Sequence, residues 1–133
     1  MRLAIAIGLM VLGLQNAAMA ADKCADASDQ PTLNACAGAA FKASDGKLNG
    51  LYRQIQERLK SDPDGSALFV KAQRAWIGFR DAECRFQTAG GGTVAPMVAA
   101  LCAQGLTEVR IKDFEGYLAC EEGDLSCPVP PAP

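Results

Sequence analysis

The sequence predicts an all-α fold, a small antiparallel three-helix bundle stapled by disulfides. Apolar residues recur every three or four positions in three long segments, which is the spacing of one helix face. Breaks rich in glycine and proline at 61–65 and 90–96 separate these segments. The chain also holds 6 cysteines and no histidine, which is typical of a small exported domain with disulfides.

The N-terminus has the pattern of a secretory signal. Met1-Arg2 precedes an apolar run from Leu3 to Leu14, and Ala18-Met19-Ala20 follows it. The run is too short to span a bilayer and has the length of a signal peptide. A buried N-terminal helix is the alternative. Lys23 stands before Cys24, where a lipoprotein signal needs a small residue, so no membrane anchor is expected after cleavage.

These features divide the chain into three expected parts. Residues 1–20 are the signal peptide and residues 21–120 the disulfide-bonded helical domain. Residues 121–133 form an acidic, proline-rich tail that we expect to be disordered apart from a tie through Cys127. The mature protein is therefore expected in the periplasm or secreted.

The first helix is expected to run to about Lys60. Asp29 can cap it, and Pro31 fits its first turn, where a missing N–H costs nothing. Its spaced face consists of Phe41, Asp45, Leu48, Tyr52, Ile55 and Leu59. The segment Ser61–Gly65 has turn composition and ends the helix.

The central helix contains the only tryptophan and two adjacent stripes. Ser66 or Asp64 can cap it, and the glycines at 90–92 end it. One stripe is apolar: Leu68, Ala72, Ala75, Phe79, Ala82 and Phe86. The other is mixed: Phe69, Gln73, Trp76 and Arg80. So wide a face predicts that this helix packs between the other two.

The third helix begins within Thr93–Pro96. Its inward side is expected to consist of Met97, Leu101, Ile111, Phe114 and Leu118. Three helices with short connections favour an up-and-down arrangement.

A polar core follows from this arrangement. Folding the first two helices about the 61–65 turn places Asp45 opposite Arg80, and Tyr52 opposite Gln73. We expect an ion pair and a hydrogen bond there, because buried polar groups need partners. The third helix would bring Arg110 to Trp76 as a cation–π contact, and Tyr117 to Phe69. The predicted structural polar core is Asp45, Asn49, Tyr52, Gln73, Trp76, Arg80 and Arg110.

The alternative makes Asp45 and Arg80 a catalytic or ligand site. The chain has no histidine, and neither a nucleophile motif nor a second acid accompanies the pair. The structural interpretation is favoured, and the sequence predicts no enzyme, no cofactor and no catalytic residue.

The disulfides are expected to be Cys84–Cys102, Cys24–Cys36 and Cys120–Cys127. The first would close the glycine loop, and a helix about 36 Å long would then separate Cys36 from Cys120. A zinc site is the alternative for the cysteines. Without histidine or closely paired cysteines it lacks its ligand pattern, so no metal is expected.

Charge limits the class of partner. Lys and Arg number 13 against 15 Asp and Glu, a net charge of −2 without a basic cluster. Nucleic acid is therefore excluded as an expected partner. A mildly acidic surface favours a cationic partner, mainly through the encounter rate.

The order of these residues resembles the LprI-like lysozyme-inhibitor family. The resemblance runs through Cys36, Asp45-x-x-Leu48-Asn49-x-x-Tyr52, Gln73-Arg-Ala-Trp76-Ile-x-x-Arg80-Asp-Ala-Glu-Cys84, the glycine run, Cys102 and Thr107-x-x-Arg110. It covers about Cys24 to Leu118, and its most specific part is the segment from Gln73 to Cys84.

The resemblance implies an exported helical domain that blocks lysozyme by occlusion. The family takes its name from a lipoprotein, and this chain departs from that pattern at Lys23. The loop of Gly90, Gly91, Gly92 and Thr93 is the candidate partner-binding segment. The alternative is a periplasmic interaction or envelope-stress module whose protein partner is not lysozyme.

Overall fold

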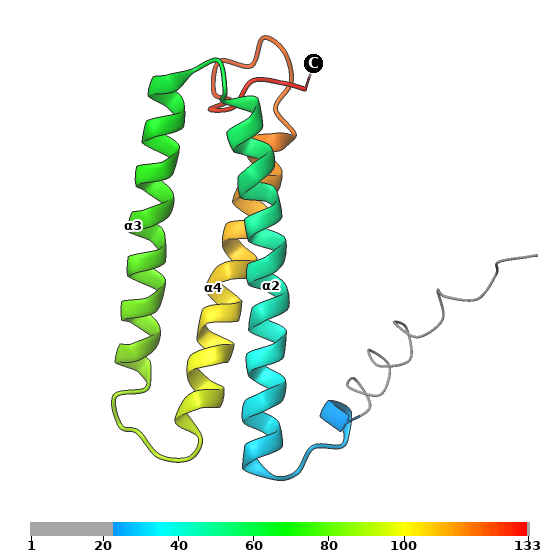
Figure 1. Ribbon diagram of the computed structural model, residues 1–133, viewed down its shortest axis with the longest axis vertical. Helices are drawn as coiled ribbons and strands as arrows, with labels where there is room; N and C mark the ends of the chain where they lie inside the picture. The colour runs from blue at the N-terminus through cyan, green and yellow to red at the C-terminus, as the bar shows by residue number, and fades with distance from the viewer. Residues whose placement is uncertain (1–22, 133) are drawn as a thin grey trace, which may run out of the picture.

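Three long helices make up most of the described chain. The computed structural model describes residues 23–132, so the expected signal peptide at 1–20 lies outside the described residues. The helices are α2 (Gln30–Arg58), α3 (Pro63–Gln87) and α4 (Ala95–Leu118). They run alternately up and down (Figure 1), and no strand occurs within residues 23–132. The all-helical prediction is confirmed.

Local chemistry explains where α2 and α3 begin. The backbone N–H of Thr32 donates to Oδ1 of Asp29 at 2.9 Å, as expected for an N-cap. Hydrogen bonds from Thr32 also hold the pKa of Asp29 below its usual range. Asp62 caps α3 in the same way, since its Oδ1 accepts from the N–H of Gly65 at 3.0 Å. The expectation of a cap at Ser66 or Asp64 was wrong because Pro63 starts the helix one turn earlier.

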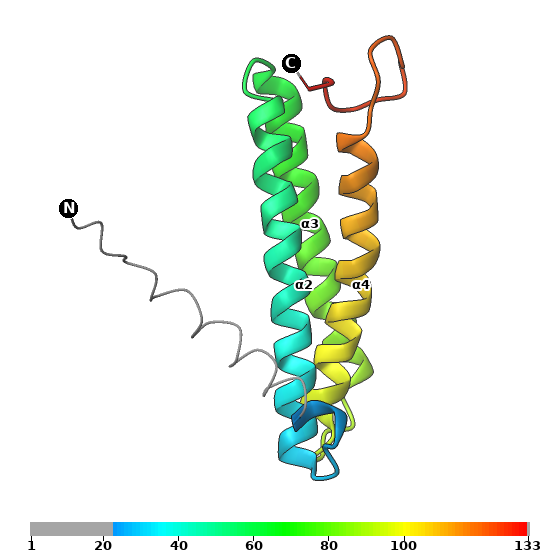
Figure 2. The same ribbon diagram turned by 90° about the vertical axis from the view of Figure 1, so that its right-hand side faces the viewer.

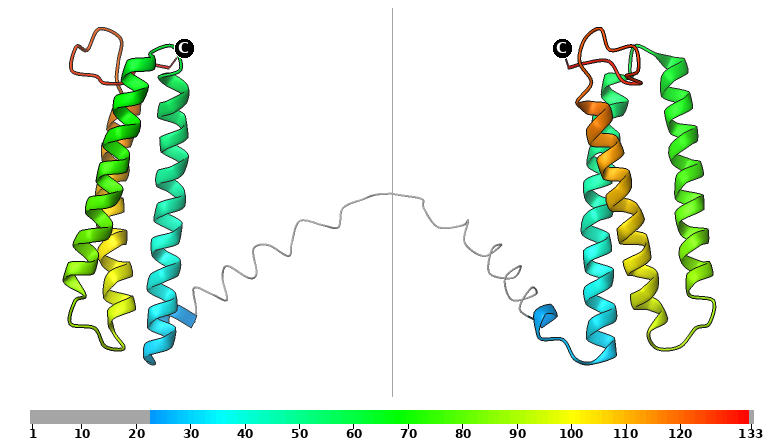
Figure 3. Two further views of the ribbon diagram at one scale, coloured as in Figure 1. Left: turned by 60° about the vertical axis from the view of Figure 1, so that its left-hand side comes forward. Right: turned by 180° about the vertical axis from the view of Figure 1, so that it is seen from behind.

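The helix that lies between its neighbours is α4, not α3. α4 packs along most of α2 and more sparsely against α3, while α2 and α3 approach each other less closely than either approaches α4. Figure 1 and the right-hand view of Figure 3 show α3 standing apart. The prediction that α3 packs between the other two was wrong.

Side-chain size accounts for this asymmetry. The buried residues of α2 and α4 include small or aliphatic ones, such as Ala37, Leu48, Ala103 and Thr107. The side of α3 that faces the bundle carries Phe69, Trp76 and Arg80. Large side chains hold helix axes farther apart than small ones do.

The apolar core extends toward the C-terminal end of α4. Its fully buried members and the residues packed around them come from all three helices and from the tail: Leu48, Ile55, Leu59, Ile111, Phe114 and Val129, with Leu51, Tyr52, Phe69, Trp76, Tyr117 and Leu118 beside them.

The apolar stripe, one of the two stripes of α3 that were expected to face neighbouring helices, points outward instead. Leu68 is 68% exposed and Phe86 76%, with Phe79 exposed between them. The mixed stripe with Gln73 and Arg80 faces the bundle, where both residues are buried. The prediction that both stripes face neighbouring helices is therefore confirmed for the mixed stripe, whose polar side chains can be buried because they are paired, and wrong for the apolar stripe.

The described part of the C-terminal segment lies against the bundle, whereas the sequence predicts disorder for 121–133. Val129 is 2% exposed and belongs to the apolar core. Nη1 of Arg58 donates to the carbonyl oxygens of Leu118 at 3.0 Å and Pro130 at 3.4 Å. The segment crosses over the end of the bundle (Figure 2). Val129, the hydrogen bond from Arg58 and the Cys120–Cys127 disulfide together hold the segment there.

Three disulfides tie the helices and the tail. They join Cys24 to Cys36, Cys84 to Cys102 and Cys120 to Cys127, which are the pairs expected from the sequence. No helix of the described part is long and apolar enough to cross a membrane.

Candidate functional site

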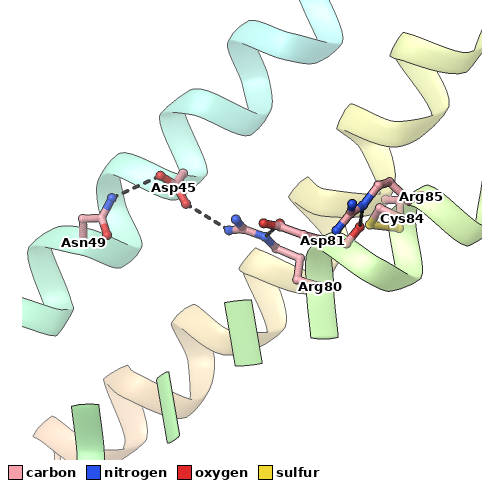
Figure 4. A network of polar contacts seen from close by, with 7 residues as sticks. Asp45, Asn49, Arg80, Asp81, Cys84 and Arg85 are labelled. Carbon is pink, nitrogen blue, oxygen red and sulfur yellow. Dashed lines mark hydrogen bonds and ion pairs between the residues drawn. A yellow bond between two sulfur atoms is a disulfide. The ribbon is translucent and has the colours of Figure 1, made fainter. Parts of the chain in front are cut away.

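The ion pair that the sequence predicts between Asp45 and Arg80 is present in the structure. Nη1 of Arg80 donates to Oδ1 of Asp45 at 3.0 Å, and Nε donates to Oδ1 of Asp81 at 2.9 Å (Figure 4). Nδ2 of Asn49 donates to the second oxygen of Asp45 at 3.1 Å. The side chain of Arg80 is 9% exposed and that of Asp45 38%. A long arginine therefore crosses the space between α3 and α2 and ends on a carboxylate at the surface.

Aromatic rings enclose the same guanidinium. Its carbon lies 5.1 Å from the centroid of Phe41 and 5.2 Å from that of Trp76. Cations over aromatic faces are stabilised by the ring quadrupole. The sequence placed Phe41 on the same helix face as Asp45 but did not predict its contact with Arg80, although its place one helical turn before Asp45 could have indicated it.

Arg110 repeats this arrangement one layer along the bundle. Its guanidinium carbon lies 5.8 Å from the Trp76 ring and 4.8 Å from the Phe114 ring. Its Nε donates to Oε1 of Gln73 at 3.2 Å, and its Nη1 makes a 3.4 Å contact with Asp113. The structure thus brings Trp76 between two arginines, and the contact expected with Arg110 is there.

The expected hydrogen bond between Tyr52 and Gln73 is absent. The hydroxyl of Tyr52 accepts from Nε2 of Gln56 at 3.1 Å, and Gln73 binds Arg110. The rings of Tyr52 and Phe69 stack with centroids 5.0 Å apart. Phe69 fills the space between α2 and α3 at this level, so the two polar groups do not meet.

The side chains of the polar core are mostly paired. Arg80 and Arg110 have carboxylate, amide and aromatic partners, which hold both side chains in place. The hydroxyl of Thr107 is buried and has no hydrogen-bond partner. Arg80 also brings a second carboxylate, that of Asp81, next to Asp45, and both carboxylates are paired with the same guanidinium.

The glycine loop forms one end of the molecule. Gly91 and Gly92 have φ of 68° and 92°, a region that side chains disfavour. Nδ2 of Asn34 donates to the carbonyl oxygen of Thr93 at 3.1 Å, which ties the loop to α2. The chain carries no charged residue between Arg85 and Glu108. This candidate segment therefore offers backbone groups and small side chains, but no charge.

The opposite end of the molecule has two adjoining hollows. An apolar hollow of about 280 Å³ is lined mainly by Leu59, Leu68, Phe69 and Val129. A second hollow of about 820 Å³ is lined by one lysine and by Asp113, Glu121, Glu122 and Asp124. Tyr117 and Pro128 line both. Sequence reasoning missed this end because the tail was expected to be disordered.

Comparison with known protein families places the chain in one of them. The model of a family described as lysozyme inhibitor LprI matches residues 20–114. The chain belongs to the LprI lysozyme-inhibitor family.

A bacterial protein is also similar to this chain. A protein of Rhizobium meliloti (strain 1021), described as uncharacterized protein R02472, is 32% identical over 120 residues. The match covers 80% of this chain and 86% of the relative. No solved structure matches the chain significantly. The matched family region contains α2, α3 and α4 as far as Phe114, and therefore most of the polar core.

Proposed function

We propose that this protein is an exported binding protein that inhibits lysozyme by occluding it. The observation that carries the proposal is the family match over residues 20–114. Three disulfides in a small helical domain suit an oxidising compartment outside the cytoplasm. The net charge of −2 suits a cationic enzyme as partner.

Inhibition by occlusion requires a rigid surface that covers the enzyme and no chemistry. A preorganised binder keeps its affinity because little ordering entropy is lost on association. The interlocked arginine–aromatic core and the disulfide ties give the helices that rigidity. The chain contains no histidine, and its polar core has the form of a scaffold, so we assign no reaction to it.

A cell-wall lysis assay tests the proposal. Purified residues 21–133 are mixed with a c-type lysozyme over a range of molar ratios, and the clearing of a cell-wall suspension is followed. We expect lysis to slow in proportion to complex formed. An unrelated protein of similar size and net charge serves as control. Unchanged lysis at micromolar excess contradicts the proposal.

A second candidate is an interaction or envelope-stress module with a different protein partner. The outward stripe of α3 favours it, because Leu68, Phe79 and Phe86 form an apolar strip on the surface. Exposed apolar surface of this kind commonly marks a protein contact. Capture from periplasmic extract by the wild type but not by a Phe79→Gln, Phe86→Gln variant, together with unaffected lysozyme inhibition, would favour this candidate.

A further inference from the structure

We infer that the end of the molecule formed by the α2–α3 turn, the end of α4 and residues 119–130 is a docking surface for a basic protein. We call it the C-terminal end. An apolar side chain of the partner would enter the hollow beside Leu68 and Val129, while its basic side chains face the acidic hollow. The inference rests on the proposed function in that lysozyme would be the basic protein.

The two hollows supply complementary chemistry at one place. The apolar hollow is lined by carbon from α3, α4 and the tail, with Arg110 as its single charged residue. The acidic hollow begins on the other side of Tyr117 and Pro128, which line both. An apolar anchor surrounded by a charged rim is the usual anatomy of a protein contact.

The charge of this surface favours a cationic partner. Four carboxylates line the acidic hollow against one lysine, Lys112, and Arg110 pairs with one of the four, Asp113. Asp62 and Asp64 lie beside Gly65, which lines the apolar hollow. Nearby Lys60 pairs with Glu57, so it adds little positive field.

Helix direction adds to the negative potential. α2 and α4 both end here, and the C-terminus of a helix carries a partial negative charge, whereas α3 begins here and its positive N-terminus offsets one of the two. The last turn of α4 has no basic residue to offset it. Arg58 compensates in part, because it donates to the carbonyl oxygen of Leu118.

The carboxylates favour a protein over a metal ion. A metal site needs several ligand atoms within about 2–3 Å of one point. Within residues 23–132 no group of three or more acidic or cysteine side chains is placed to hold an ion. The charges are spread along a rim, which suits a surface of several lysines and arginines.

A binding titration with two matched pairs of variants tests the inference. Binding of a c-type lysozyme to residues 21–133 is measured by calorimetry at low and high salt. The first variant, Glu121→Gln with Glu122→Gln, removes two charges from side chains that are exposed and make no hydrogen bond within the described chain. Its control, Glu83→Gln with Glu108→Gln, removes two charges elsewhere and leaves the same net charge.

We expect the first variant to bind about tenfold more weakly at low salt, and the control to change affinity less than about twofold. At high salt the difference should shrink, because the screening length falls to about 3 Å at 1 M. Equal affinity of the two variants would overturn the inference.

The second pair tests the apolar hollow. Leu68→Gln changes a residue at its wall, and Phe86→Gln changes the same stripe at the glycine end; both are exposed, so both should fold. We expect the Leu68 variant to lose about tenfold in affinity and the Phe86 variant to match the wild type. The reverse order overturns the inference but leaves inhibition intact. No binding or inhibition by the wild type overturns both the inference and the proposed function.

Discussion

The two ends of this molecule are closed by different means. At the glycine end, a disulfide and two glycines with positive φ join α3 to α4 without any charge. At the C-terminal end, a docked tail with Val129 in the core covers the helices and carries several carboxylates. The glycine run, which the sequence singled out as the candidate binding segment, forms an uncharged connection between two helices. The tail, which the sequence did not single out, forms a hollowed and acidic surface.

Removing one disulfide at each end should produce the largest effects on stability. It should also distinguish the roles of the two ends in binding. On the chain-entropy model, loss of the Cys84–Cys102 bridge lowers the unfolding free energy by about 3 kcal/mol, and loss of the shorter Cys120–Cys127 loop by about 2 kcal/mol. Serine replacement of each pair, followed by urea unfolding, measures both. We expect only the second replacement to weaken lysozyme binding. A binding loss confined to the first would reverse the comparison.

Truncating the buried valine should have the next largest effect. Val129→Ala removes core contacts with α2 and α4 and should cost about 1–2 kcal/mol of stability. Val94→Ala makes the same change at the exposed glycine end and should cost less than about 0.5 kcal/mol. Thermal unfolding compares them. Equal shifts would show that the tail is not docked in solution.

Replacing the glycines of the α3–α4 loop with alanine should lower stability at two of the three positions. Gly91→Ala and Gly92→Ala force a side chain into positive φ and should each cost about 1 kcal/mol. Gly90→Ala is the control, because Gly90 does not have positive φ and an added Cβ meets no atom within 4 Å. Urea midpoints measure the three variants. We expect all three to inhibit like the wild type, since this end is assigned no partner contact.

Each end also carries one carboxylate whose titration reports local order, and this effect should be the smallest. Hydrogen bonds from Thr32 lower the pKa of Asp29, and hydrogen bonds from Ser126 lower that of Asp124. A lowered folded pKa stabilises the fold above the unfolded pKa, and that contribution is lost as pH falls through the folded value. Carboxyl resonances followed by NMR should therefore titrate below the usual Asp range at both sites. An ordinary pKa at Asp124 would mean that the tail loop is open.

Much of the helical scaffold could be predicted from the sequence, because it depends on local and covalent signals. Asp29 with Pro31 fixes the start of α2, and the spacing of the cysteines limits their pairing. Asp45 and Arg80 were predicted as a pair because charges buried on facing helices need each other.

The packing of α3 and of the tail could not be predicted, because it depends on side-chain sizes and on contacts between residues far apart in the sequence. The apolar stripe through Leu68 and Phe86 had the better helical periodicity, yet the stripe with Arg80 and Trp76 faces inward because its members pair across three helices. The docking of Val129 likewise depends on a long-range fit, and composition alone predicted disorder there. The docking surface at the C-terminal end could therefore not be predicted from the sequence.

Amide hydrogen exchange of the mature chain, alone and with a c-type lysozyme, tests the assignment of the two ends most directly. We predict slower exchange in residues 112–129 when lysozyme is present, with no change in residues 88–95. Protection of residues 88–95 with none at the C-terminal end would contradict it.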